Sequence, residues 1–135
     1  MVESRKPTIS ESERDVLKAL WDAGPGTVRD VAGRLRASGR DWAYTTVMTL
    51  LGRLETKGYV TSDKTGFAHV FRAAVSRDGV VQQRLEALAE EFCDGEQAPL
   101  VLALVQGQRF TPEELAEFRR LIDELEPKKP KGRKK

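Results

Sequence analysis

The chain has 135 residues, of which 39% are hydrophobic and 33% are charged, which is typical of one small globular domain with an appendage. No apolar run approaches the roughly 18 residues that span a bilayer, and a single cysteine and a single histidine exclude an internal disulfide and a Cys-rich metal site. The net charge of +2 is distributed unevenly along the chain. Residues 1–80 carry 13 basic and 10 acidic side chains, residues 81–126 carry 4 basic and 11 acidic ones, and residues 127–135 carry 6 basic and no acidic ones. DNA phosphates would repel the acidic middle segment, which argues against DNA contact by residues 81–126.

Three helices are predicted before residue 58. The first begins at a capping box, Ser10 with Glu13, and ends at the Gly-Pro-Gly of residues 24–26. The second begins with the analogous pair Thr27 and Asp30, and the third runs roughly over residues 44–57 with Gly58 as its C-terminal cap. Apolar residues recur at helical spacing and are expected to face the core: Val16, Leu17, Leu20 and Trp21, then Val28, Val31, Ala32 and Leu35, then Val47, Leu50, Leu51 and Leu54.

The periodicity then changes to that of strands. Residues 59–62 and 67–72 are predicted to form a hairpin around a four-residue link, 63–66, that contains a glycine. Three helices followed by a hairpin is the plan of a winged helix-turn-helix domain. We therefore expect a mainly α fold with one small hairpin, in which residues 1–75 form a winged-helix DNA-binding domain.

The rest of the chain returns to helix. Residues 76–126 are predicted to form three short helices with narrow apolar stripes, and residues 127–135 form a basic tail that we expect to be disordered. Because so short a segment cannot build its own core, its stripes should be buried against something else, most simply a second copy of the chain. Packing onto the winged domain of the same chain is the alternative. The expected dimer interface consists of Val81, Leu85, Leu88, Phe92, Leu100, Leu104, Leu115, Phe118, Leu121, Ile122 and Leu125.

The third helix carries the side chains best suited to DNA. If its apolar stripe faces the core, its other face presents hydroxyls and an arginine, which can contact phosphates and base edges in the major groove. Threonine is a mediocre helix former, so three within five positions favour a function. In the hairpin, a lysine at the tip and two residues of the second strand are expected to contact DNA. The candidate DNA-binding residues are Arg40, Tyr44, Thr45, Thr46, Thr49, Arg53, Lys64, His69 and Arg72.

The chain shows no pattern that indicates catalysis. It contains no Gly-rich phosphate loop, nucleophile elbow or metal-ligand spacing, so we expect a cytoplasmic protein that is not an enzyme and binds no metal, cofactor or membrane. The expected partners are double-stranded DNA and a second copy of the chain. Two alternatives to a sequence-specific repressor are a winged-helix adaptor for other proteins and a non-specific, architectural DNA-binding protein. A redox sensor acting through Cys93 is a third hypothesis, although a buried, inert cysteine is far more common.

Several segments together resemble the penicillinase-repressor (BlaI/MecI) family. They are residues 10–21, 27–31, 44–49, 53–54 and 57–60, the hairpin and its exit at 66–72 and 74–77, and residues 110–115 and 121–125. The run Tyr-Thr-Thr-Val-Met-Thr at residues 44–49 is the most specific of these. The resemblance implies a cytoplasmic homodimer that binds inverted-repeat operators, places its third helix in the major groove and represses transcription.

The sequence departs from that family at two places. Phe67, His69 and Val70 stand where the family's wing usually carries more arginine and tyrosine, which implies weaker contact between the wing and phosphates. The β-lactamase repressors of the family are induced by cleavage at an Asn–Phe bond in the tail region, and residues 94–99 contain no such pair. An inducing protease, a ligand or another partner all stay open as routes to derepression.

Overall fold

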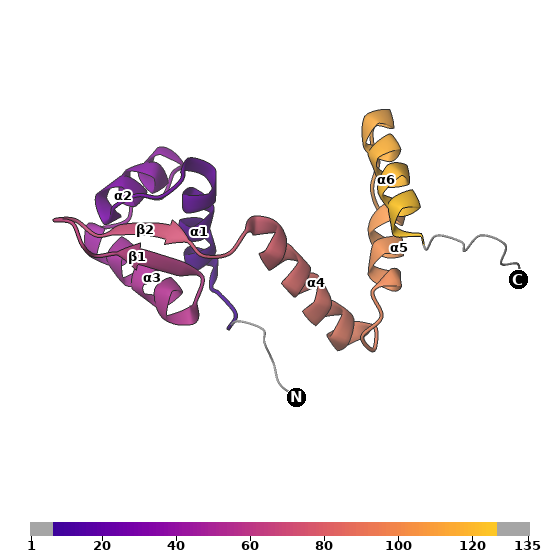
Figure 1. Cartoon of the computed structure of the whole chain (residues 1–135), viewed down its shortest axis with the longest axis horizontal. Coiled ribbons are helices and arrows are strands. Elements are labelled where there is room, and N and C mark those ends of the chain that lie inside the picture. Colours follow the sequence, from indigo (N-terminus) through magenta and orange to yellow (C-terminus); the bar gives the residue numbers. More distant parts are fainter. Residues whose placement is uncertain (1–6, 127–135) are drawn as a thin grey trace, which may run out of the picture. The chain divides into compact units, whose positions relative to one another are not determined.

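The computed structural model describes residues 7–126 and divides the chain into two compact units, one extending to Leu88 and the other beginning at Ala89. The first unit contains three helices, a hairpin and most of a fourth helix (Figure 1). The elements in chain order are α1 (Glu11–Ala23), α2 (Val28–Ala37), α3 (Tyr44–Lys57), β1 (Val60–Asp63), β2 (Val70–Ala73), α4 (Arg77–Phe92), α5 (Ala98–Gln106) and α6 (Pro112–Leu125). The expected class, a mainly α fold with one small antiparallel hairpin, is confirmed.

Side-chain caps define where the first two helices begin. The Ser10 hydroxyl accepts a hydrogen bond from the N–H of Glu13 at 3.1 Å, and the Glu13 carboxylate accepts one from the N–H of Ser10 at 2.9 Å. Thr27 and Asp30 make the same reciprocal pair at the start of α2. Each box satisfies backbone donors that the first turn of a helix leaves unpaired. Both predicted helix starts are therefore confirmed.

The core of the first unit lies between α1, α2, α3 and the hairpin. All but one of the residues predicted to face the core are buried; the exception, Trp21, packs against the core from a partly exposed position. The hairpin contributes Tyr59, Val60 and Phe71 to the same cluster. Because the three apolar helix faces all point inward, the opposite face of α3 is left at the surface.

The hairpin differs from its prediction. Val60 pairs with Ala73 and Asp63 with Val70, so the first strand keeps its predicted length but lies one residue later, the second strand is shorter than expected, and the link between them covers residues 64–69. The Asp63 side chain accepts hydrogen bonds from the N–H and the hydroxyl of Thr65, which turns the chain immediately after β1. His69 therefore lies just before β2 and not within it.

The base of the hairpin is fastened to the turn between α1 and α2. Gly26 and Phe71 exchange two backbone hydrogen bonds, of 2.9 and 2.8 Å. A Cβ atom at Gly26 would lie 2.8 Å from the Arg34 guanidinium and 2.9 Å from the Asp30 Cβ, so only glycine fits this approach. The hairpin is thus held from two sides, by its own ladder and by this bridge.

The start of α4 is attached to the first unit. The Trp21 indole donates to the Val75 carbonyl at 2.9 Å, and Val80 packs against the core. Arg77 forms an ion pair with Asp22 at 2.6 Å and stacks over the Trp21 ring. The boundary between the two compact units, after Leu88, accordingly falls inside α4.

The second unit has little core of its own. Neither α5 nor α6 contains a buried residue. Phe110 and Phe118 meet edge to face with ring centroids 4.9 Å apart, and Thr111 and Glu114 exchange hydrogen bonds at the start of α6. The predicted basic tail, residues 127–135, lies outside the described residues. Between residues 7 and 126, no helix is long and apolar enough to cross a membrane.

Candidate nucleic-acid interface

The exposed face of α3 is the most distinctive polar surface of the first unit. Tyr44, Thr45, Thr46, Thr49 and Arg53 are all exposed, as the sequence predicts. Within residues 7–126, the three threonine hydroxyls and the Arg53 guanidinium form no hydrogen bond or ion pair, so they are available to a ligand. Hydroxyl groups with both donor and acceptor capacity beside a fork-shaped cation suit phosphates and base edges.

The N-terminus of α3 is free of the side-chain caps that close α1 and α2. Its N-cap is Ala43, whose side chain cannot accept a hydrogen bond. The first-turn N–H groups therefore have no side-chain acceptor, and with the helix dipole they favour a negatively charged group at this end. The residues immediately behind this end, Tyr44 to Thr46, belong to the exposed face described above.

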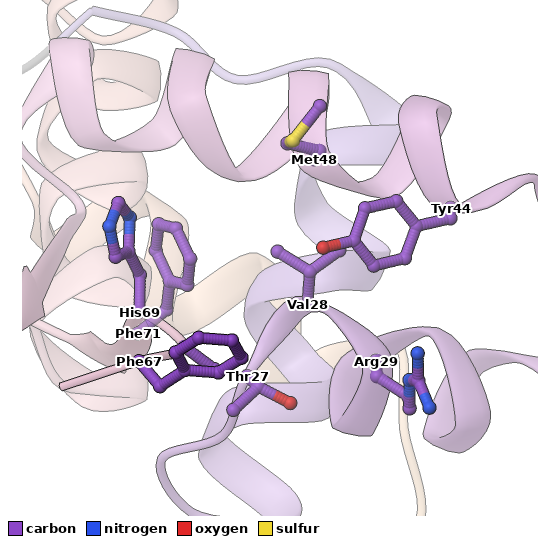
Figure 2. A pocket seen from close by; sticks show the side chains of 9 residues that line it. Thr27, Val28, Arg29, Tyr44, Met48, Phe67, His69 and Phe71 are labelled. Carbon is purple, nitrogen blue, oxygen red and sulfur yellow. The ribbon is translucent and has the colours of Figure 1, made fainter. Parts of the chain in front are cut away.

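An open cleft of about 670 Å³ lies between α3, the start of α2 and the hairpin (Figure 2). It brings Tyr44 and His69, both predicted DNA-binding residues, to the same surface. Its lining is mainly apolar and consists of Thr27, Val28, Arg29, Tyr44, Met48, Phe67, Ala68, His69 and Phe71. Figure 2 shows Met48 on α3 above the cleft and the Phe67 ring across from it on the link of the hairpin.

The other residues of this cleft were not among the predicted site residues, and those with polar or large side chains at its surface are Thr27, Arg29, Met48 and Phe67. Met48 follows Tyr44 by four positions and therefore shares its edge of α3, a signal that the sequence does contain. Phe67 is fully exposed. An aromatic ring with no contact in the free protein indicates a surface that is covered by a partner.

Two predicted DNA-binding cations are already paired. The Arg40 guanidinium lies 2.9 Å from the Asp15 carboxylate of α1 and 5.6 Å from the centroid of the Trp42 ring. Lys64 Nζ lies 3.1 Å from a carboxylate oxygen of Glu55 on α3. These contacts join residues far apart in the sequence, so no local pattern could reveal them. Arg72, by contrast, lies exposed in β2, opposite Thr61.

The C-terminal end of α3 is anchored by a buried carboxylate. The Glu13 side chain is only 2% exposed, and Lys57 Nζ donates to it at 2.7 Å. Burial raises the pKa of Glu13, but the hydrogen bonds from Lys57 and from the Ser10 N–H outweigh this effect, so its pKa lies below the ordinary value. Lys57 also donates to the Thr8 carbonyl at 3.0 Å. The anchor ties α3 to α1 and to the residues before it.

The remaining reactive groups do not form a chemical site. Among the described residues, no three His, Cys, Asp or Glu side chains are placed to share a metal ion. Cys93 is a free, partly exposed thiol directly after α4. Nothing in its surroundings tests the redox hypothesis.

Comparison with known proteins identifies the family to which this chain belongs. The family model for the penicillinase repressor matches residues 9–124. The chain belongs to the penicillinase repressor family. It is 36% identical over 120 residues to the transcriptional regulator BlaI of Mycobacterium tuberculosis, covering 87% of this chain and 85% of that protein. It is 24% identical over 123 residues to the penicillinase repressor of Bacillus licheniformis, covering 91% and 95%.

Two solved structures of BlaI proteins also show similarity to this chain. The DNA-binding domain of the repressor BlaI is 26% identical, with a TM-score of 0.49, and covers 57% of this chain and 93% of that one. The Bacillus licheniformis BlaI monomer in complex with the blaP half-operator is 27% identical, with a TM-score of 0.47, and covers 56% and 90%. Penicillinase repressors are DNA-binding transcriptional regulators, so the resemblance drawn from the sequence and the expectation that the chain is not an enzyme are confirmed.

Proposed function

We propose that this member of the penicillinase repressor family binds an inverted-repeat DNA operator as a homodimer, with α3 of each copy in the major groove. The observation that carries the proposal is the free polar face of α3, on which three threonine hydroxyls and Arg53 have no partner among residues 7–126. A surface of this kind at the N-terminal half of a helix is the usual means by which a helix-turn-helix protein contacts bases.

Each candidate residue then has a defined task. Thr45, Thr46, Thr49 and Arg53 contact base edges and the nearest phosphates, and Tyr44 contacts the DNA backbone from the edge of α3 beside the cleft. His69 and Arg72 supply contacts from the hairpin. Arg40 and Lys64 contribute only after they leave their present carboxylate partners, so their share of the affinity is small.

A second copy of the chain is the proposed cover for the apolar surface of α4, α5 and α6. Phe92, Leu104, Ile122 and Leu125 are each more than half exposed, which is costly for a protein that remains a monomer. The first unit has an apolar groove of its own, of about 480 Å³ between α1 and α4, with Val81, Leu85 and Leu88 along one side. The interface consists of these residues together with Leu100, Leu115, Phe118 and Leu121.

The division of labour follows the chain. DNA recognition belongs to residues 1–75 and self-association to residues 76–126, while the basic segment 127–135 adds attraction that is independent of DNA sequence and sensitive to salt. An operator-binding repressor of this kind acts in the cytoplasm. A protease or another partner that separates the two copies would derepress the target gene.

The test combines DNA binding with a measurement of stoichiometry. Duplexes are first selected from a randomised pool with the full chain, and their affinity is compared with that of a scrambled duplex at several salt concentrations. Light scattering then counts the chains in each complex. We expect two chains on one inverted repeat, bound at least about 10³-fold more tightly than the scrambled duplex.

Other outcomes would replace the proposal. Binding that depends on salt but not on sequence would support the architectural alternative. Absence of binding to every duplex would support the adaptor, and one chain per selected duplex at all concentrations would remove the homodimer.

A further inference from the structure

A closed triangle of polar contacts joins α3 to the wing, the name used here for residues 60–73. The Ser62 hydroxyl of β1 donates to Oε2 of Glu55 on α3 at 2.7 Å. Lys64 Nζ donates to the same carboxylate oxygen at 3.1 Å and to the Ser62 hydroxyl at 2.6 Å. No other side chain of α3 forms a hydrogen bond or ion pair with the wing in the described part of the chain.

Within the triangle, the Glu55 carboxylate compensates the positive charge of Lys64, which DNA phosphates would otherwise attract. Hydrogen bonds from Ser62 and then from Lys64 hold the pKa of Glu55 below its ordinary value, and the nearby His69 acts in the same direction. Glu55 is therefore a carboxylate at neutral pH. Its partner Lys64 is half-exposed and is the one lysine among residues 60–73 of the wing. In the free protein this charge is compensated by Glu55.

The triangle also lies beside the surface proposed to contact DNA. Glu55 follows Met48 by seven positions and Tyr44 by eleven, so the three residues share one edge of α3. Tyr44 and Met48 line the cleft that α3 forms with the wing, and His69 lines the same cleft from the other side. Neither Glu55 nor Lys64 lines the cleft itself, but Glu55 continues the edge of α3 that does.

We propose that Glu55 is a positioning residue for DNA binding, which holds the wing on α3 and withholds the Lys64 charge from phosphates until the ion pair opens. The inference rests on the proposed function, since it needs DNA at this face. A free cation adds to sequence-independent binding by releasing counterions, and a cation bound to a carboxylate adds little. Glu55 thus restrains attraction to DNA that lacks the operator.

The test uses the Glu55→Gln variant, which removes the charge but keeps an oxygen that Ser62 can donate to. The affinity for one fixed mixed-sequence duplex is measured over a range of salt concentrations, so no operator is needed. Freeing Lys64 adds one phosphate contact, and we expect the slope of log Kobs against log salt to steepen by about 0.9. In a Lys64→Met background the same substitution should leave the slope unchanged.

A matched control separates this local effect from the change in net charge. Asp22→Asn also removes one carboxylate from the first unit, but Asp22 pairs with Arg77 and not with the wing. Its slope should equal that of the unsubstituted chain. Thermal unfolding of each variant shows whether a change in affinity merely follows a change in stability.

The outcomes are distinct. A steeper slope for Glu55→Gln that is absent in the Lys64→Met background supports the inference. A slope equal to that of the unsubstituted chain, with or without a lower Tm, overturns it and leaves Glu55 with a structural role at most. If the unsubstituted chain still selects an inverted repeat, only this inference fails; if it binds no duplex at all, the proposed function fails as well.

Discussion

At the scale of single residues, the exposed threonines and Arg53 on α3 carry the functional argument. Replacement of Arg53 or Thr46 by alanine should weaken operator binding by about 1–3 kcal/mol, because contacts to base edges are lost while the core face of α3 is unchanged. Fluorescence titration with the selected duplex measures the loss. Arg119→Ala, which removes an exposed arginine from α6, is the control. Unchanged operator affinity in both variants would show that another surface contacts the bases.

The lowered pKa of Glu13 predicts how the free energy of unfolding depends on pH. Because its pKa is lower in the folded chain, its ionised form stabilises the fold above the ordinary glutamate pKa, and this contribution disappears as the pH falls through the folded-state pKa. Glu13→Gln should therefore lower the free energy of unfolding by about 1.5–3 kcal/mol at neutral pH, and by less below about pH 4. Urea unfolding at both pH values measures the difference, with the exposed Glu91→Gln as control. A deficit of equal size at both pH values would contradict this explanation.

Some features of single residues can be predicted from the sequence and others cannot. The capping boxes of α1 and α2 and the core face of α3 follow from spacing alone, because partners three or four positions apart on a helix are neighbours whatever the tertiary fold. The partners of Arg40 and Lys64 do not follow from spacing. Asp15 precedes Arg40 by a whole helix and a turn, and the contact exists only because α1 and α2 pack together.

At the scale of elements, two glycines inside helices separate stability from function. A Cβ atom at Gly33 in α2 or at Gly52 in α3 would meet no atom within 4 Å, and neither residue has a positive φ. Alanine at either position should stabilise the helix by up to about 1 kcal/mol, since glycine is a poor helix former. Thermal unfolding should show a higher Tm for both variants.

The same pair of variants tests which element approaches DNA. Gly52 lies between Thr49 and Arg53 on the proposed recognition face, so its replacement should also weaken operator binding, because the added methyl group lies where DNA comes close. Gly33→Ala should leave the affinity unchanged. Equal affinity in the two variants would argue against close approach of DNA to the middle of α3.

Elements differ in how well the sequence predicts them. The approximate bounds predicted for α3 agree with the observed ones, because a long apolar stripe and a C-terminal glycine mark them. The hairpin was predicted, but its second strand begins at Val70, later than expected, so the link between the strands is longer than the sequence pattern indicates. The cleft between α3 and the wing could not be predicted, since it depends on how two elements pack and not on the pattern of either.

At the scale of the whole molecule, the uncovered apolar surface of the second unit predicts self-association. Ile122→Glu would place a charge on the proposed interface, where Ile122 is 61% exposed in the single chain. The variant should sediment as a monomer at concentrations at which the unsubstituted chain is a dimer. Its affinity for the inverted repeat should fall by about 10²-fold or more, because two α3 helices no longer bind together.

The control for this variant is Ala116→Glu, which adds the same charge at an exposed alanine six positions earlier in α6. It should leave both sedimentation and operator affinity unchanged. If Ile122→Glu sediments as the unsubstituted chain does, the apolar face of α6 has another purpose.

The bridge between Gly26 and Phe71 has an evolutionary consequence. It locks the base of the hairpin to the helices, whereas residues 64–69 extend beyond it and Phe67 contacts nothing. Lys64 and Thr65 have hydrogen-bond partners in α3 and β1. Mutations in the codons for residues 66–69 can therefore alter the length and chemistry of the tip at little cost in folding, and mutations at the bridge cannot. Duplicated copies of such a gene would therefore differ in operator preference first through changes at the tip, while the residues at the base of the hairpin change more slowly.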